Sequence, residues 1–138
     1  MNNNILLLLI LLFISESGIS QTTTGDTIRK DYVFVRTEIE PTFPGGEGAW
    51  TKYIKKKIEK NIDALVDDNK SGTCRVKFIV DKEGNISNVE VLSMQGSVLA
   101  KVAMNAIAKG PKWIPAMQNG RTVTSYKEQP LTFTIEAR

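Results

Sequence analysis

Residues 73–92 read TCRVKFIVDKEGNISNVEVL, and the alternation in this stretch decides the fold. Apolar residues fall at every second position of residues 73–81, which predicts a half-buried β-strand. The side chains that share this apolar face are Cys74, Val76, Phe78 and Val80. Residues 81–85 are rich in turn formers, and residues 86–92 alternate again. The stretch therefore predicts a β-hairpin.

Two amphipathic helices and one more strand flank the hairpin. Before it, apolar residues recur at steps of three or four, at Trp50, Ile54, Ile58, Ile62 and Leu65. After it, residues 98–108 carry a second helical stripe, at Leu99, Val102, Ala103, Ala106 and Ile107. Gly110 and Pro111 end that helix, and Pro130 opens a last strand over residues 131–135. We therefore expect an α+β fold, a three-stranded antiparallel sheet (order 2-1-3) with two helices packed on one face.

The start of the chain differs from the rest. The 138 residues suffice for one domain, and the composition, 41% hydrophobic and 24% charged, is that of a globular protein. Residues 1–20 have the layout of a signal peptide, with an apolar run over 5–14 and small residues at Gly18 and Ser20. An uncleaved inner-membrane anchor is the alternative, although a spanning helix needs about 20 apolar residues. We expect an exported protein with a polar tether over residues 21–42 and a folded domain over residues 43–138.

Composition argues against catalysis. The chain has no histidine, which removes the usual general base and zinc ligand. Its single cysteine, Cys74, lies at an inward strand position, where thiols are usually inert. Without residues 1–20 the chain has 18 basic and 14 acidic side chains, a net charge of +4, which permits acidic partners but demands none. We expect no enzyme, no cofactor, no metal and no nucleic-acid partner.

Other groups have a functional and a structural interpretation. The lysines on one helix, Lys52, Lys55, Lys56 and Lys60, could meet lipid head groups or polyanions, but a solvated helix face is favoured. Trp50 and Trp113 fit core packing better than ligand stacking. Residues 81–85 fit a hairpin turn better than a calcium loop. Thr27, within an Asp-Thr-Ile triplet, is similar to the O-glycosylation acceptor of Bacteroidetes envelope proteins.

Several segments in this order carry a family resemblance. They are residues 41–47 (PTFPGGE), 72–86 (GTCRVKFIVDKEGNI), 89–92 (VEVL), 111–116 (PKWIPA), 119–123 (NGRTV) and 130–133 (PLTF). Together they resemble the C-terminal domain of the energy transducer TonB, in the form common in Bacteroidetes-type bacteria. The resemblance covers about 95 residues.

The resemblance implies binding in the periplasm. TonB domains add a short segment of an outer-membrane receptor as a strand to their sheet edge. This implies an outer-membrane TonB-dependent transporter or other envelope protein as partner, within transmembrane transport of nutrients or siderophores. The implied docking edge is Leu131, Thr132, Phe133, Thr134 and Ile135. Residues 32–35 could instead fold back over this edge.

A full TonB protein also has an inner-membrane helix and a long proline-rich spacer. We expect this chain to lack the spacer, and therefore to lack the parts needed to transmit proton-motive energy by the family's mechanism. The alternative function is a structural or regulatory envelope protein that retains the fold without energy transduction. Membrane association is expected to be peripheral if any, and a homodimer is left open.

Overall fold

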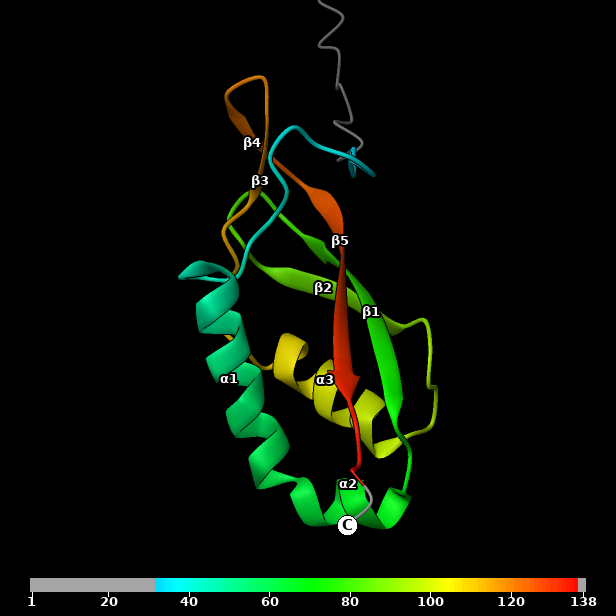
Figure 1. The fold of residues 1–138 in the computed structure, drawn as a ribbon. Helices are drawn as coiled ribbons and strands as arrows, with labels where there is room; N and C mark the ends of the chain where they lie inside the picture. The colour runs from blue at the N-terminus through cyan, green and yellow to red at the C-terminus, as the bar shows by residue number, and fades with distance from the viewer. Residues whose placement is uncertain (1–31, 137–138) are drawn as a thin grey trace, which may run out of the picture. The chain divides into compact units, whose positions relative to one another are not determined.

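β1 (Gly72–Val80) is the centre of the sheet, and it follows directly from the alternating stretch. The computed structural model describes residues 32–136. β2 (Ile86–Val91) and β5 (Ser125–Phe133) pair with β1 on either side, both antiparallel, in the order β2-β1-β5 (Figure 1). The other elements are α1 (Gly46–Lys60), α2 (Ile62–Asp68), α3 (Val98–Ala108), β3 (Ala116–Gln118) and β4 (Arg121–Val123). The predicted α+β fold and strand order are confirmed.

The first helical stretch is two helices, where one was predicted. The side-chain amide of Asn61 donates to the carbonyl of Lys57 at 2.7 Å, and the Asn61 backbone leaves the helical region with φ −114° and ψ 15°. Asparagine competes in this way for backbone groups and interrupts helices. After the break Ile62 is 41% exposed, whereas Leu65 is 1% exposed. The described part of the chain thus has three helices, and Ile62 does not belong to the predicted apolar face.

The last strand begins earlier than predicted. β5 starts at Ser125 and ends at Phe133, so Pro130 lies within the strand, opposite Arg75, and does not open it. Proline is tolerated there because β5 is an edge strand. The prediction placed the strand too late because it treated proline as a boundary.

The loop after α3 contains a hairpin that was not predicted. β3 and β4 pair antiparallel around Asn119 and Gly120, whose φ angles are 51° and 73°. Two successive left-handed residues make a type I′ turn, the turn that Asn-Gly favours. The chain before α1 lies along this hairpin, because isolated bridges join Ile39 to Met117 and Thr42 to Ile114.

The core lies between the sheet and the helices. α3 packs on β1 and β2, and α1 and α2 pack on α3. Trp113 is 3% exposed, with its ring centroid 5.0 Å from that of Phe78 and 5.7 Å from that of Trp50. The predicted core positions of Trp113, Trp50 and Cys74 are confirmed, and the last of these is fully buried.

Candidate partner-binding edge

The outer edge of β5 is the surface at which the resemblance implies docking. In an antiparallel ladder, the backbone groups of successive residues point to opposite sides of the strand. The N–H of Tyr126 donates away from β1, to the carbonyl of Phe34 at 2.9 Å. The same alternation turns Glu128, Pro130 and Thr132 outward. Even-numbered residues of β5 therefore form its free edge.

The start of this edge is covered by the chain's own N-terminal segment. The N–H of Phe34 donates to the carbonyl of Thr124 at 2.9 Å, which with the bond from Tyr126 makes a parallel bridge to Ser125. Lys127 Nζ donates to Glu40 Oε2 at 2.8 Å and holds the same segment. This hydrogen bond and the lysine charge lower the pKa of Glu40. Phe34 therefore folds back onto the start of β5, and not onto residues 131–135 as the alternative expected.

The rest of the edge is open but interrupted. Within residues 32–136, the outward N–H and C=O of Glu128 and Thr132 have no hydrogen-bond partner. Pro130 has no N–H, and its carbonyl meets only the side-chain amide of Gln129, at 3.5 Å, beyond a good hydrogen bond. The edge therefore offers two donors on either side of a proline.

The five residues of the implied docking edge do not share one environment. Leu131 is 7% exposed and belongs to the core. Thr132 faces outward and Phe133 ends the strand, half-buried. Thr134 and Ile135 follow the strand, and the N–H of Ile135 donates to Ser71 Oγ at 2.9 Å. Of the five, Thr132 has the clearest outward backbone groups.

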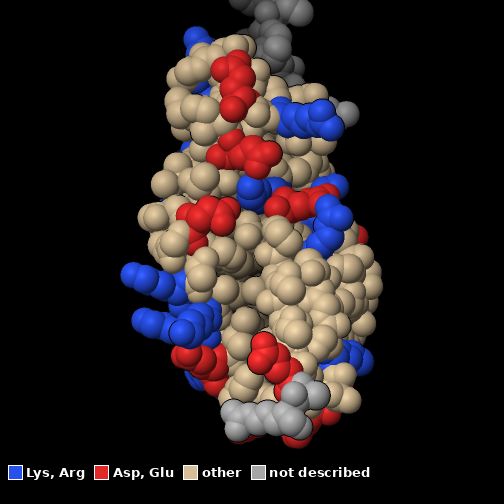
Figure 2. Space-filling view, viewed as in Figure 1, with Lys and Arg blue, Asp and Glu red and all other residues tan. Residues whose placement is uncertain are grey.

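The predicted lysines project from α1 into solvent. Lys52, Lys55, Lys56 and Lys60 are all exposed, and Figure 2 shows basic side chains along the side of the molecule where α1 lies. Lys55 approaches Glu59 at 3.9 Å. Exposed pairs of this kind contribute about 0–1 kcal/mol.

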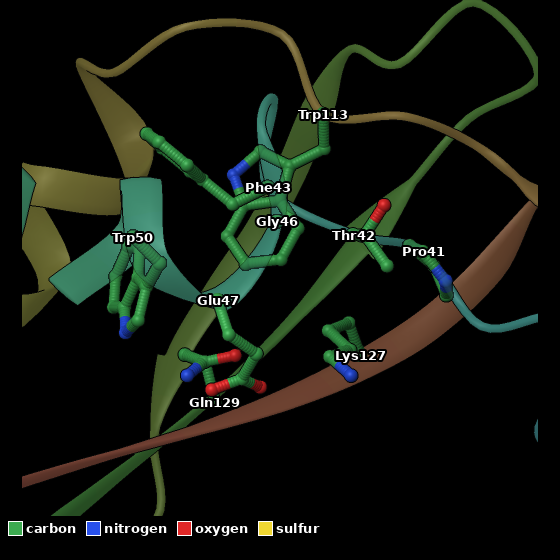
Figure 3. Close-up of a pocket in the computed structure, with 9 residues that line it drawn as sticks. All are labelled: Pro41, Thr42, Phe43, Gly46, Glu47, Trp50, Trp113, Lys127 and Gln129. Carbon is green, nitrogen blue, oxygen red and sulfur yellow. The ribbon is translucent and has the colours of Figure 1, made fainter.

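A small pocket lies between the start of α1 and β5. Its volume is about 40 Å³, and Phe43, Trp50 and Trp113 line it on one side (Figure 3). Lys127 and Gln129 reach it from β5, and Glu47 reaches it from α1. This volume is far below the several hundred Å³ of typical small-molecule sites. Nothing in the sequence indicated the pocket, because its residues come from three separate segments.

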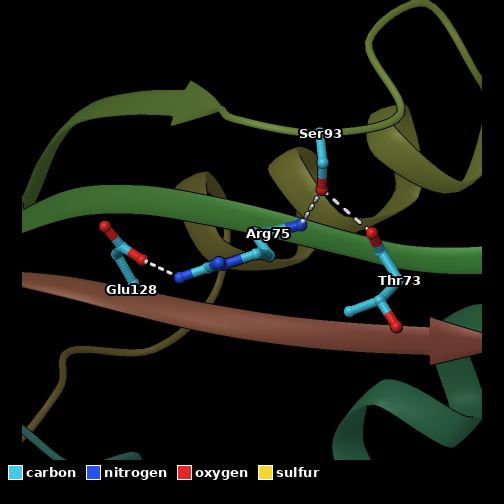
Figure 4. A network of polar contacts seen from close by, with 4 residues as sticks. All are labelled: Thr73, Arg75, Ser93 and Glu128. Carbon is cyan, nitrogen blue, oxygen red and sulfur yellow. Dashed lines mark hydrogen bonds and ion pairs between the residues drawn. The ribbon is translucent and has the colours of Figure 1, made fainter.

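The solvent face of the sheet fixes β5 to β1. Arg75 Nη2 donates to Glu128 Oε2 at 2.6 Å, and the hydroxyls of Thr73 and Thr132 bond at 2.9 Å. Ser93 Oγ accepts from the N–H of Arg75 and donates to the carbonyl of Thr73, both at 2.9 Å (Figure 4). These bonds use side chains of β1 and β5, and the backbone groups of β1 that face β2. They leave the outward backbone of β5 unused.

The opposite edge of the sheet, along β2, is less suited to pairing. The β1–β2 register shifts between Lys77 and Ile79, and Asn88 has φ 50°. The side chain of Gln95 donates to the carbonyl of Leu92 at 3.0 Å and approaches that of Val91 at 3.4 Å. Bulges and side-chain caps are devices that block strand addition. β5 is therefore the more accessible edge.

The other groups that the sequence singled out do not form a site in the described part of the chain. Burial raises the pKa of the Cys74 thiol, which makes it a poor nucleophile. The turn after β1 is a hairpin turn, with Asp81 Oδ1 accepting from the N–H groups of Glu83 and Asn85, both at 2.9 Å. Thr27 and residues 1–20 lie outside the described residues. Across residues 32–136, no helix could cross a membrane and no three acidic or cysteine side chains gather as metal ligands.

The topology defines the class as a small α+β domain whose three-stranded sheet has the order β2-β1-β5. The model of the Gram-negative bacterial TonB protein C-terminal family matches residues 64–135, from within α2 to two residues beyond β5. The match covers more than half of the 138 residues, and the chain belongs to this family. Family membership indicates a TonB-like domain of the cell envelope. No curated protein matches the chain.

Proposed function

We propose that the domain binds an extended segment of an envelope protein, which adds as a strand to the outer edge of β5. The partner is an outer-membrane TonB-dependent transporter or another envelope protein, and the domain binds it in the periplasm. The observation that carries the proposal is the set of unbonded outward backbone groups at Glu128 and Thr132, within residues 32–136. Backbone pairing needs no distinctive side-chain motif on the domain.

The edge supports a transient complex. Glu128 and Thr132 each offer an N–H and a C=O, and Pro130 adds one C=O. At about 0.5–1.5 kcal/mol net for each hydrogen bond, five bonds give roughly 5 kcal/mol. Association costs at least about 4 kcal/mol in rigid-body entropy. Backbone bonds alone therefore give weak binding, and side-chain contacts must supply the remainder.

A binding role fits the described chemistry better than catalysis. The chain has no histidine and its one thiol is buried. These observations support the proposal that the domain is not an enzyme.

A second candidate is the structural or regulatory role. It is favoured by the bridge between Phe34 and Ser125, which already occupies the start of the edge. In that role the N-terminal segment would compete with an incoming strand. The two roles differ in whether the open part of β5 is used.

The test compares two substitutions of Thr132. Thr132→Pro removes the outward N–H, whereas Thr132→Val removes only the hydroxyl that bonds to Thr73. Each purified variant is used to capture proteins from an outer-membrane extract of the source organism. We expect a band captured by the wild type and by Thr132→Val that falls about two- to tenfold with Thr132→Pro. The loss of one hydrogen bond of about 0.5–1.5 kcal/mol lowers the affinity by roughly that factor. Equal capture by all three folded proteins would contradict docking at this edge.

A further inference from the structure

The pocket beside β5 lies where a docked strand would place a side chain. Lys127 and Gln129 pair with Phe78 and Val76, which belong to the core. Paired residues point to the same face of a sheet, so Lys127 and Gln129 point to the helix face. β5 is the edge strand, and no β1 residue lines the pocket. The pocket is therefore at the sheet margin, and Figure 2 shows that face hollowed between α1 and β5.

A strand added outside β5 continues the same alternation. Its residue beside Gln129 must point to the helix face, as Gln129 does. That direction leads to the start of α1, where Glu47 and Trp50 stand across the pocket (Figure 3). The neighbouring partner residues point to the solvent face. Only every second side chain of the added strand therefore faces the pocket. Of these, the one beside Gln129 is the best placed to enter it.

The shape and chemistry of the pocket select that side chain. A volume of about 40 Å³ accepts roughly two waters or a small aliphatic group, and not an aromatic ring. Buried Phe43, Trp50 and Trp113 supply an apolar floor. At the rim, Lys127 is already paired with Glu40, while Glu47 has no ion-pair partner within residues 32–136. An acidic side chain would meet Glu47 without a free cation to offset it.

We propose that this pocket, at the start of α1, receives a small aliphatic side chain, such as valine, from the strand that docks on β5. The inference rests on the proposed function, since the occupant belongs to the docked strand. It assigns specificity to Trp50, Trp113 and Gln129, and affinity to the backbone of Glu128 and Thr132.

The test uses random nine-residue peptides displayed on phage, selected on the mature protein. Three variants follow: Thr132→Pro, Gln129→Phe, which fills the pocket from its rim, and Gln129→Thr, a small strand-forming control. Thermal melting confirms that each variant is folded. Selected peptides are then synthesised, and binding is followed by fluorescence of Trp50 and Trp113, the only two tryptophans of the chain.

We expect the peptides that lose binding with Thr132→Pro to share one position enriched in valine, isoleucine or threonine. Replacing that residue by glycine should weaken binding about tenfold. Gln129→Phe should abolish the preference, whereas Gln129→Thr should keep it. The pocket hypothesis is refuted if the Thr132-dependent peptides share no such position, or if their preference persists with Gln129→Phe. Either result leaves docking at the β5 edge supported. If no selected peptide depends on Thr132, edge docking fails, and the pocket inference fails with it.

Discussion

Gly84, in the turn between β1 and β2, provides the sharpest test of the packing. Its φ is +87°, and a Cβ there would lie 2.1 Å from the carbonyl oxygen of Trp113. The N–H of Trp113 also donates to the carbonyl of Gly84 at 3.0 Å. Gly84→Ala therefore has two costs. The positive φ adds backbone strain of about 1–2 kcal/mol, and the new Cβ clashes with a carbonyl oxygen that can move only with its backbone. Because that movement breaks the hydrogen bond and shifts a buried tryptophan, we expect a total loss of about 3–5 kcal/mol.

Gly120 is the matched control, since its φ is +73° and a Cβ there would meet nothing within 4 Å. Gly120→Ala should cost only the strain, about 1–2 kcal/mol. Urea titrations of both variants, with unchanged m-values, give the two free energies of unfolding. The difference between them, about 2 kcal/mol or more, measures the close approach of the turn to Trp113. Equal losses at the two glycines would refute this packing.

Three further predictions concern the core, the turn and export. Trp113→Ala should lower the free energy of unfolding by about 3–5 kcal/mol, and a loss below about 1 kcal/mol in urea would contradict its burial. Asp81→Ala should destabilise the hairpin at neutral pH. Burial acts to raise the pKa of Asp81, but the hydrogen bonds from N–H groups of the turn have the larger combined effect, so the pKa is lowered. A lowered pKa gives stability that is present above the unfolded pKa and lost as pH falls through the folded one. The difference between wild type and variant in urea titrations should therefore begin to shrink as pH falls below about 4. Mass spectrometry of the envelope fraction should find a chain that starts near Gln21, and an intact chain from Met1 in the inner membrane would favour the anchor.

Sequence periodicity predicted the elements whose signals are local. The alternation around Val76 and Phe78 predicted β1 and its inward face, because a strand's two faces are encoded at every second residue. The same argument failed for β5, since a proline on an edge strand loses no ladder bond and need not mark a boundary. Asn61 was missed as a helix break because its effect depends on a side-chain bond to Lys57, not on apolar spacing.

The candidate site depended on contacts that no local pattern encodes. Phe34 meets the start of β5 through two backbone bonds to residues about ninety positions away. Lys127 and Glu40 are 87 residues apart. Neither contact leaves a periodic signal in the sequence. The family resemblance gave the docking strand, and only the structure separates its outward residue Thr132 from its buried residue Leu131.

Two features limit strand addition along β5, and they explain why its open part suits a transient partner. A nine-residue edge with every group free would invite uncontrolled pairing between chains. Phe34 covers the start of β5, and Pro130 removes a donor from its middle. The remaining donors, Glu128 and Thr132, are four residues or about 13 Å apart, so an added strand must cross the proline to use both. Gln129 and the pocket lie in that interval, where a side-chain contact can offset the missing backbone bond.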